Sequence, residues 1–237
     1  MSLTDNVVAI AGASGGLGPT VVRAFAEAGA KIAVAGRNPA DLTQLLDSLH
    51  LPDDRRLASS VDLTGDAATQ AWADQILARF GHVDVVLHLV GGYKGGTLIA
   101  DIPMADWDFT HTVLIKTVLN VVRAFVNPLK ANGWGRFISV TSPRAQAPSA
   151  KTALYAMGKA AADALVLALA DEFKGTGATA NLIVVNSIVT PEQRAAEPGK
   201  DFSRSTAAEE IAAAMLYLCS DEANAINGAC LPLTSRG

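Results

Sequence analysis

The stretch that decides the fold is Gly12-Ala13-Ser14-Gly15-Gly16-Leu17-Gly18-Pro19, which lies between an apolar run, Val7–Ala11, and a helical pattern, Val21–Ala28. Its glycines fall at a strand-to-helix turn, where a backbone without side chains can approach an anion and the helix N-terminus adds positive partial charge. Pro19 suits the first helical turn, where no N–H partner is needed. The loop predicts a pyrophosphate site, and a tight turn that binds no ligand is the alternative.

Seven short aliphatic or β-branched runs alternate with longer helical patterns. They are Val7–Ala11, Lys31–Ala35, Leu57–Val61, Val83–Val90, Arg136–Thr141, Ala180–Val185 and Ala229–Leu233. Because these runs do not alternate apolar with polar residues, they are typical of strands buried on both faces. We therefore predict an α/β, doubly wound Rossmann fold, with a seven-stranded parallel sheet and helices on both faces. No repeat or linker divides the chain, which predicts one domain over residues 1–237.

Composition excludes several classes of protein. The chain has 237 residues, 50% hydrophobic and 18% charged, and its net charge of -4 offers no basic field for nucleic acid. Cys219 and Cys230 form no Cys/His cluster, which predicts a reducing compartment and no metal site. No export signal is visible, and residues 175–191, one of the longest uncharged stretches, are too polar to cross a bilayer. We expect a cytoplasmic protein with no membrane partner.

Three polar residues could carry chemistry. Tyr155 and Lys159 stand four apart in a helical pattern, so they share a helix face, and Ser142 ends the preceding strand. A nearby ammonium favours a phenolate, so we expect Lys159 to lower the pKa of Tyr155 and make it a general acid. Ser142 would hydrogen-bond a substrate carbonyl oxygen, where negative charge develops as hydride arrives at carbon. An exposed Tyr/Lys pair without a role is the alternative.

The GxxxGxG spacing of the loop, Ser142 and the pair Tyr155 and Lys159, in this order, resemble the short-chain dehydrogenase/reductase family over essentially the whole chain. The resemblance implies an oxidoreductase that transfers hydride between a nicotinamide cofactor and a small carbonyl or alcohol substrate, without a metal. Its catalytic residues would be Ser142, Tyr155 and Lys159. Its cofactor-binding residues would be Gly12, Ser14, Gly15, Gly16, Leu17, Gly18, Arg37, Asp62, Leu63, Gly91, Tyr155, Lys159, Ile188 and Thr190.

The choice of cofactor depends on the end of the second strand, where NAD-selective dehydrogenases carry an acid for the ribose 2′-hydroxyl. This chain has Gly36 and Arg37 there. No carboxylate repels a 2′-phosphate, and the guanidinium of Arg37 is suited to bind one. NADP(H) is therefore favoured. NAD(H) remains open, because Arg37 could be a solvated loop charge and Asp41 is near in sequence.

Further cofactor contacts follow from the resemblance alone. Asp62 and Leu63 match the pair that contacts adenine, although Asp62 could equally be a helix cap. Gly91 matches the glycine beside the cofactor ribose. Ile188 and Thr190 match positions that hold the carboxamide and the pyrophosphate, and the alternative for Thr190 is loop capping.

The chain departs from the family pattern beside the cofactor. His88-Leu89-Val90-Gly91 replaces Asn-Asn-Ala-Gly, Val185-Asn186 replaces Pro-Gly, and Leu114 stands where many members carry a catalytic asparagine. We expect His88, on an apolar strand, to be a hydrogen-bonded core histidine rather than an acid or base. These departures motivate an alternative function, a catalytically impaired dinucleotide-binding regulatory or scaffold protein with the same fold.

The remaining expectations concern assembly and the substrate loop. The resemblance implies a homodimer or homotetramer formed through helices at about Met104–Leu129 and Lys151–Lys174. The irregular segment Ser187–Ser205 is the best candidate for a lid, and it is short for the family, which predicts an open site. The pattern Thr206-Ala207-Ala208-Glu209 predicts a capping box at the next helix.

Overall fold

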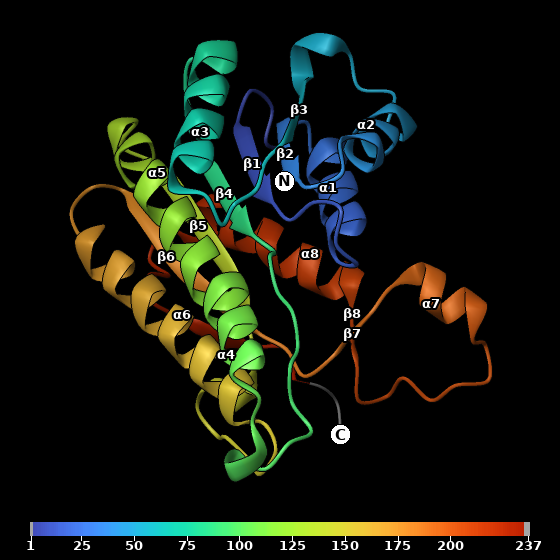
Figure 1. The fold of residues 1–237 in the computed structure, drawn as a ribbon. Coiled ribbons are helices and arrows are strands. Elements are labelled where there is room, and N and C mark those ends of the chain that lie inside the picture. The colour runs from blue at the N-terminus through green and yellow to red at the C-terminus, as the bar shows by residue number, and fades with distance from the viewer. Residues whose placement is uncertain (1, 235–237) are drawn as a thin grey trace.

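The structure is a computed structural model and describes residues 2–234. One sheet holds seven parallel strands in the order β3-β2-β1-β4-β5-β6-β9 (Figure 1). The strands are β1 (Val7–Ala11), β2 (Lys31–Gly36), β3 (Arg56–Ser60), β4 (Val85–His88), β5 (Gly135–Thr141), β6 (Ala178–Val184) and β9 (Cys230–Pro232). Each overlaps one of the seven predicted runs, so the predicted doubly wound parallel fold is confirmed.

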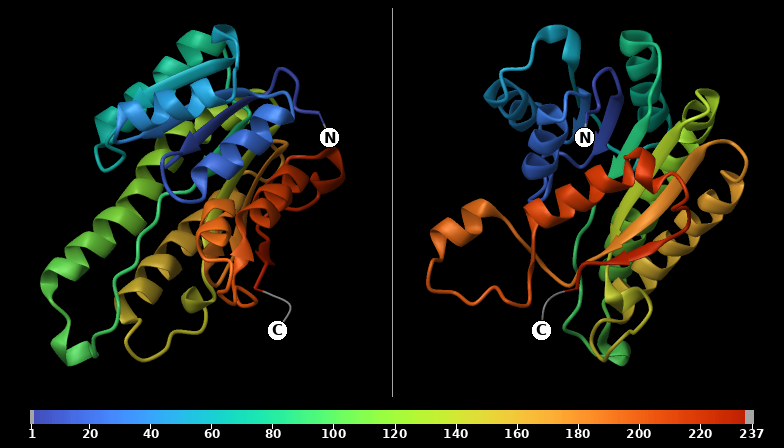
Figure 2. Two further views of the ribbon diagram at one scale, coloured as in Figure 1. Left: turned by 90° about the vertical axis from the view of Figure 1, so that its right-hand side faces the viewer. Right: turned by 180° about the vertical axis from the view of Figure 1, so that it is seen from behind.

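Helices cover both faces of the sheet, as Figures 1 and 2 show. They are α1 (Gly18–Glu27), α2 (Pro39–Ser48), α3 (Asp66–Phe80), α4 (Met104–Thr110), α5 (Thr117–Ala131), α6 (Ala153–Glu172), α7 (Pro191–Ala196) and α8 (Ala208–Leu218). Short 3-10 turns are η1 (Asp53–Arg55), η2 (Ile99–Asp101), η4 (Pro143–Ala145) and η5 (Asp221–Ala223). Apolar side chains of α3, α5 and α6 pack on one face, and those of α1, α2 and α8 pack on the other.

The strand order reverses between β1 and β4, which pair in parallel with Val8 opposite Val85. In open α/β sheets, ligands bind outside the carboxyl ends of the strands at such a reversal. The glycine loop leaves β1 at this point, and residues 89–98 leave β4 beside it. The fold therefore brings the predicted site residues to one edge of the sheet.

The helix expected at about Met104–Leu129 is divided in the structure. The π-helical segment η3 (His111–Lys116) joins α4 to α5. Residues 104–131 and α6 are both long and apolar enough to cross a membrane by length and composition. In the most apolar part of each helix, 50% and 39% of the residues are buried. Core helices of soluble proteins have the same properties, and α5 and α6 each pack one face on the sheet.

The predicted lid is held at both ends. The strands β7 (Ile188–Val189) and β8 (Thr206–Ala207) pair in parallel, with Ile188 opposite Thr206, and form a separate two-stranded sheet. The sequence patterns did not predict this pairing. Between the two strands, α7 and its flanking chain project away from the main sheet (Figures 1 and 2). The predicted capping box is wrong by one residue, because Thr206 lies in β8 and the backbone amide of Ala207 donates to Glu210 at 3.1 Å.

Candidate active site

The glycine loop contains two glycines that the fold requires and one that leaves room. Gly12 has φ of +85°, and a Cβ there would lie 3.0 Å from the Val90 amide nitrogen, in the chain that leaves β4. A Cβ on Gly18 would lie 1.9 Å from the Ala13 carbonyl oxygen. A Cβ on Gly16 would meet nothing within 4 Å. The open side of Gly16, next to the N-terminus of α1, therefore fits a group such as a pyrophosphate.

The end of β2 offers a cation and no carboxylate. A Cβ on Gly36 would lie 2.7 Å from Ser14 Oγ and 3.2 Å from Leu42 Cδ2, so a larger residue would require a shift of its neighbours. Arg37 is exposed, and its carbonyl oxygen accepts a hydrogen bond from Ser60. Because Ser14 occupies the space beside Gly36, this edge presents a hydroxyl and a guanidinium. Both groups are suited to a phosphate.

The other predicted cofactor residues differ in how exposed they are. Asp62 is exposed, and its carboxylate accepts from the amide and the hydroxyl of Thr64, which hold its pKa below the ordinary value. Leu63 is buried in the core instead. A Cβ on Gly91 would meet nothing within 4 Å, so its surroundings are open. Asp62 stabilises a turn ahead of α3, which leaves its expected contact with adenine a prediction.

Ile188 and Thr190 lie at the start of the projecting segment. Ile188 is in β7 and is half-buried. Thr190 caps α7, because its hydroxyl accepts from the Gln193 amide at 3.3 Å and the Gln193 side chain accepts from the Thr190 amide at 2.9 Å. The alternative reading of Thr190, loop capping, is the role that these contacts give it.

Ser142 and Tyr155 meet at the carboxyl edge of the sheet. Ser142 follows β5 directly, is buried, and accepts a hydrogen bond from the Arg144 amide. Tyr155 lies in the first turns of α6 and is partly exposed. Burial raises the pKa of Tyr155 above its ordinary value, and the interaction with the Ser142 hydroxyl opposes this more weakly. The expected lowering of this pKa by Lys159 is therefore wrong for this structure.

Lys159 is buried below these two residues. Its ammonium donates to the carbonyl oxygen of Val140 in β5 at 2.8 Å, so it does not offset the effect of burial on Tyr155. Burial also lowers the pKa of Lys159 to about 8, and Asp163 acts in the opposite direction. A protonated phenol beside a hydroxyl, with an amine that titrates near neutrality, can hold and transfer a proton.

An aromatic residue that the sequence patterns did not single out stands over Tyr155. The ring of Tyr93, in the chain that leaves β4, makes an edge contact with the Tyr155 ring, with centroids 5.1 Å apart. Tyr93 is 60% exposed. The same loop is tied to the turn before α6, because the Gly96 amide donates to the Lys151 carbonyl at 2.8 Å. The one sequence feature that could have pointed to Tyr93 is its position two residues after Gly91.

The residues that depart from the family pattern have structural contacts. His88 is buried, with Ser139 Oγ 3.4 Å from Nδ1 and Thr117 Oγ1 3.3 Å from Nε2, as expected for a core histidine. Leu114, in η3, is buried against α6, and a Cβ on Gly158 would lie 2.9 Å from its Cδ1. Leu114 thus fills space beside the helix that carries Tyr155.

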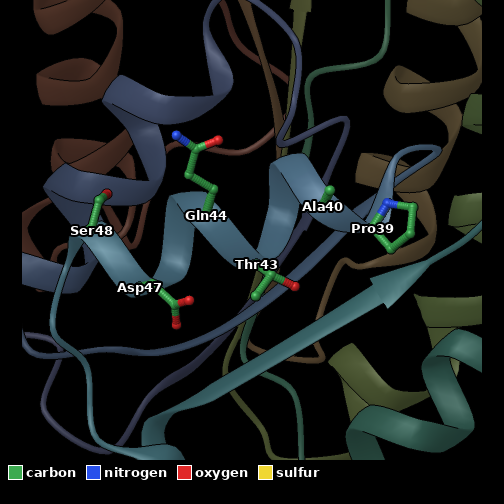
Figure 3. A pocket seen from close by; sticks show the side chains of 6 residues that line it. All are labelled: Pro39, Ala40, Thr43, Gln44, Asp47 and Ser48. Atoms are coloured by element: carbon green, nitrogen blue, oxygen red, sulfur yellow. The ribbon is translucent and has the colours of Figure 1, made fainter.

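A hollow of about 680 Å³ lies on the outer face of α2, the helix that begins two residues after Arg37 (Figure 3). It is lined by Pro39, Ala40, Thr43, Gln44, Asp47 and Ser48. The one ionisable side chain among them, Asp47, forms an ion pair with Arg56. This hollow therefore lacks the paired groups that acid–base chemistry requires, and the carboxyl edge of the sheet is the better site.

A glycine loop at the reversal of a parallel sheet, with Ser142, Tyr155 and Lys159 toward the same carboxyl edge, is typical of Rossmann-fold oxidoreductases. The family model described as Enoyl-(Acyl carrier protein) reductase matches residues 12–234. The chain belongs to the short-chain dehydrogenase/reductase family.

The chain resembles characterised relatives and solved structures over nearly its whole length. It is 26% identical over 246 residues to 7alpha-hydroxysteroid dehydrogenase of Escherichia coli (strain K12), covering 100% of this chain and 96% of that protein. It is 29% identical to Dehydrogenase/reductase SDR family member 6 of Danio rerio, covering 95% and 94% of the two chains. A short-chain type dehydrogenase/reductase from Mycobacterium ulcerans shares the fold, with a TM-score of 0.89, 23% identity, and coverage of 98% of this chain and 90% of that one.

Proposed function

We propose that the protein is an NADP(H)-dependent oxidoreductase that interconverts a carbonyl and an alcohol, with Ser142, Tyr155 and Lys159 as its catalytic residues. The observation that carries this proposal is the grouping of these three side chains at the carboxyl edge of the sheet, the edge that also carries the glycine loop. A binding module has no chemical need for a phenol, a hydroxyl and a buried amine together.

The proposed roles follow from the chemistry of each side chain. The nicotinamide, when bound, supplies or accepts the hydride. Tyr155 is protonated at neutral pH, because burial raises its pKa, so its phenol can donate a proton to a substrate oxygen. Ser142 Oγ lies beside that phenol and can donate to the same oxygen, where negative charge develops. Lys159 supplies a positive charge one helical turn below Tyr155.

The preference for NADP(H) rests on the end of β2. Gly36 has no room for a carboxylate while Ser14 keeps its position, and Arg37 is exposed next to it. A guanidinium binds a 2′-phosphate in a bidentate manner, whereas a 2′-hydroxyl gains little from it. Gly12, Gly15, Gly16, Leu17 and Gly18 would hold the pyrophosphate, and Asp62, Gly91, Ile188 and Thr190 would line the rest of the cofactor.

We further propose a substrate with a bulky apolar body. Large apolar side chains are exposed on the chain from the end of β4 to the first residue of α4. They are Tyr93, Leu98, Ile99 and Met104. Tyr93 contacts Tyr155, so an apolar group held there would lie next to the proposed proton donor. A relative whose name specifies a hydroxysteroid is consistent with this class of substrate.

We also propose a homodimer or homotetramer in the cytoplasm. Leu119 on α5 and Met157 and Leu167 on α6 are 39–50% exposed, on helices whose opposite faces pack on the sheet. Exposed apolar side chains on adjacent helices are typical of subunit interfaces. The cysteines of the chain, Cys219 and Cys230, are free thiols, which agrees with a reducing compartment. Sedimentation at micromolar concentration tests the assembly, and a monomer alone would contradict it.

The test of function begins with fluorescence titrations of the purified protein with NADPH and NADH, followed by a panel of ketones and aldehydes. We expect tighter binding of NADPH and turnover of apolar ketones. Tyr155→Phe should bind NADPH as wild type does and lose turnover by about 100-fold or more. Tyr217→Phe, at an exposed tyrosine on α8, is the matched control and should keep full activity. Binding without turnover by wild type would favour the impaired, regulatory alternative, and an active Tyr155→Phe would remove Tyr155 from the mechanism.

A further inference from the structure

A carboxylate continues the line of Tyr155 and Lys159 along α6. Asp163 follows Lys159 by four residues, as Lys159 follows Tyr155, so the three side chains lie on one face of the helix. Lys159 and Asp163 are each only 8% exposed. The helix packs against β5 and β6. The helix therefore buries an ammonium and a carboxylate one turn apart, directly below the proposed proton donor.

Asp163 is poorly compensated where it lies. Its Oδ1 has no hydrogen-bond partner among residues 2–234, and neither has Thr141 Oγ1, whose side chain lies close enough to lower the pKa of the carboxyl. Within the same residues, Asp163 has no ion-pair partner within 4.0 Å. Burial raises the pKa of Asp163, and Lys159 opposes that rise. A buried carboxylate with no ion pair within 4.0 Å destabilises a fold, so its presence needs a reason other than packing.

We propose that Asp163 is a positioning residue that keeps Lys159 in its charged form for the reaction at Tyr155. This proposal depends on the proposed function only for what the charge of Lys159 does in the reaction, and not for the effect of Asp163 on that charge. It goes beyond the Ser142, Tyr155 and Lys159 set, because Asp163 does not touch the reacting atoms.

The other groups that face Lys159 and Asp163 do not supply a second negative charge. His88, from β4, is neutral at physiological pH, because burial lowers its pKa to about 3. Thr141, from β5, carries no charge, and burial raises the pKa of the Cys230 thiol on β9. The hydrogen-bond acceptor of the Lys159 ammonium is a carbonyl, that of Val140. Among residues 2–234, Asp163 is the acidic side chain that acts on Lys159, since burial lowers the pKa of Lys159 to about 8 and Asp163 opposes that fall.

The direct test measures the protonation of Lys159 in cofactor-free protein. The chain has eight lysines, so the methylene signals next to their amines can be resolved by NMR after ¹³C-lysine labelling, and Lys159→Arg identifies the signal of Lys159. Asp163→Asn removes the charge and keeps the shape. We expect the titration midpoint of Lys159 to fall by about one pH unit, a tenfold loss of proton affinity. Asp171→Asn, at an exposed position of the same helix, is the control and should leave the midpoint unchanged.

The second readout is the pH profile of turnover. In Asp163→Asn, the alkaline limb of kcat/KM should move to lower pH by the same amount, which a merely structural role would not produce. If Asp163→Asn does not fold, Asp163→Ser removes the same charge with a smaller side chain and should give the same shift. An unchanged Lys159 midpoint in the folded variant would overturn the proposal, and so would a shifted midpoint with an unmoved alkaline limb. If no carbonyl is turned over by wild type, the proposed function fails, and the Lys159 midpoint still decides whether Asp163 holds its charge.

Discussion

His88 makes the stability of the protein depend on pH in a way that one substitution can isolate. The imidazole is 3% exposed on β4, and burial lowers its pKa from 6.5 to about 3, with a further contribution from the charge of Lys159. The unfolded chain therefore binds a proton at His88 in a range of pH where the folded chain does not. The unfolded state gains this proton below about pH 6.5. The contribution of His88 to the free energy of unfolding is therefore fully present above that pH and is lost as the pH falls.

The magnitude follows from the two pKa values. At pH 7 the histidine is mostly neutral in both states, so it changes the free energy of unfolding little. At pH 5 protonation favours the unfolded state by a factor of about 30, which lowers the free energy of unfolding by about 2 kcal/mol. Any folded pKa of His88 below about 4 gives the same result, because the group is then neutral at pH 5 in the folded state.

The assay is guanidinium unfolding at pH 7 and pH 5. His88→Asn removes the titrating ring and keeps polar atoms near Ser139 and Thr117. We expect the loss of stability between the two pH values to be about 2 kcal/mol smaller in this variant than in wild type. His50→Asn is the control, because His50 is exposed and its φ of +52° suits asparagine, and it should behave as wild type. An equal loss in wild type and His88→Asn would refute the reasoning.

Three further predictions concern the proposed site. Arg37→Ala should raise the KM for NADPH by about tenfold and the KM for NADH far less, and equal effects in steady-state kinetics would discard the assignment. Gly18→Ala should destabilise the fold by about 3 kcal/mol or more, because its Cβ would lie 1.9 Å from the Ala13 carbonyl oxygen, whereas Gly16→Ala should fold normally and bind NADPH more weakly. Calorimetry and fluorescence titration separate these two outcomes. Tyr93→Ala should raise the KM for bulky apolar ketones several-fold and leave the Kd of NADPH unchanged, and a uniform effect on all ketones would contradict its role as an apolar contact.

The sheet could be predicted because its strands are buried on both faces. A continuous apolar run such as Val7–Ala11 is hard to place elsewhere in a protein of this size, and all five of its residues are buried. The order of runs and helical patterns then leaves few possible topologies. The edge of the sheet that carries Ser142, Tyr155 and Lys159 follows from that topology, since the carboxyl ends of parallel strands point the same way.

Other features were beyond the sequence patterns for physical reasons. The pairing of β7 with β8 involves two residues in each strand, too few to produce a periodic pattern. The π-helical segment η3 has six residues, too few for a sequence pattern to distinguish its period from that of an α-helix. The pKa of Tyr155 depends on how deeply the ring is buried and on where the Lys159 ammonium is bonded, which are properties of packing. Asp163 gave no signal beyond its spacing, since a charge in a helical pattern is usually solvated.

The pairing of β7 with β8 separates a segment that can change in sequence from the part of the fold that positions the site. Residues 190–205 connect β7 to β8. Because these two strands pair, the two ends of the segment stay adjacent whatever its length or sequence. A longer, shorter or differently charged segment can therefore be exchanged there without moving the sheet or the groups at its edge. The positions of Tyr155 and Lys159 on α6 then stay the same, while the length and charge of the proposed substrate lid can change between related proteins.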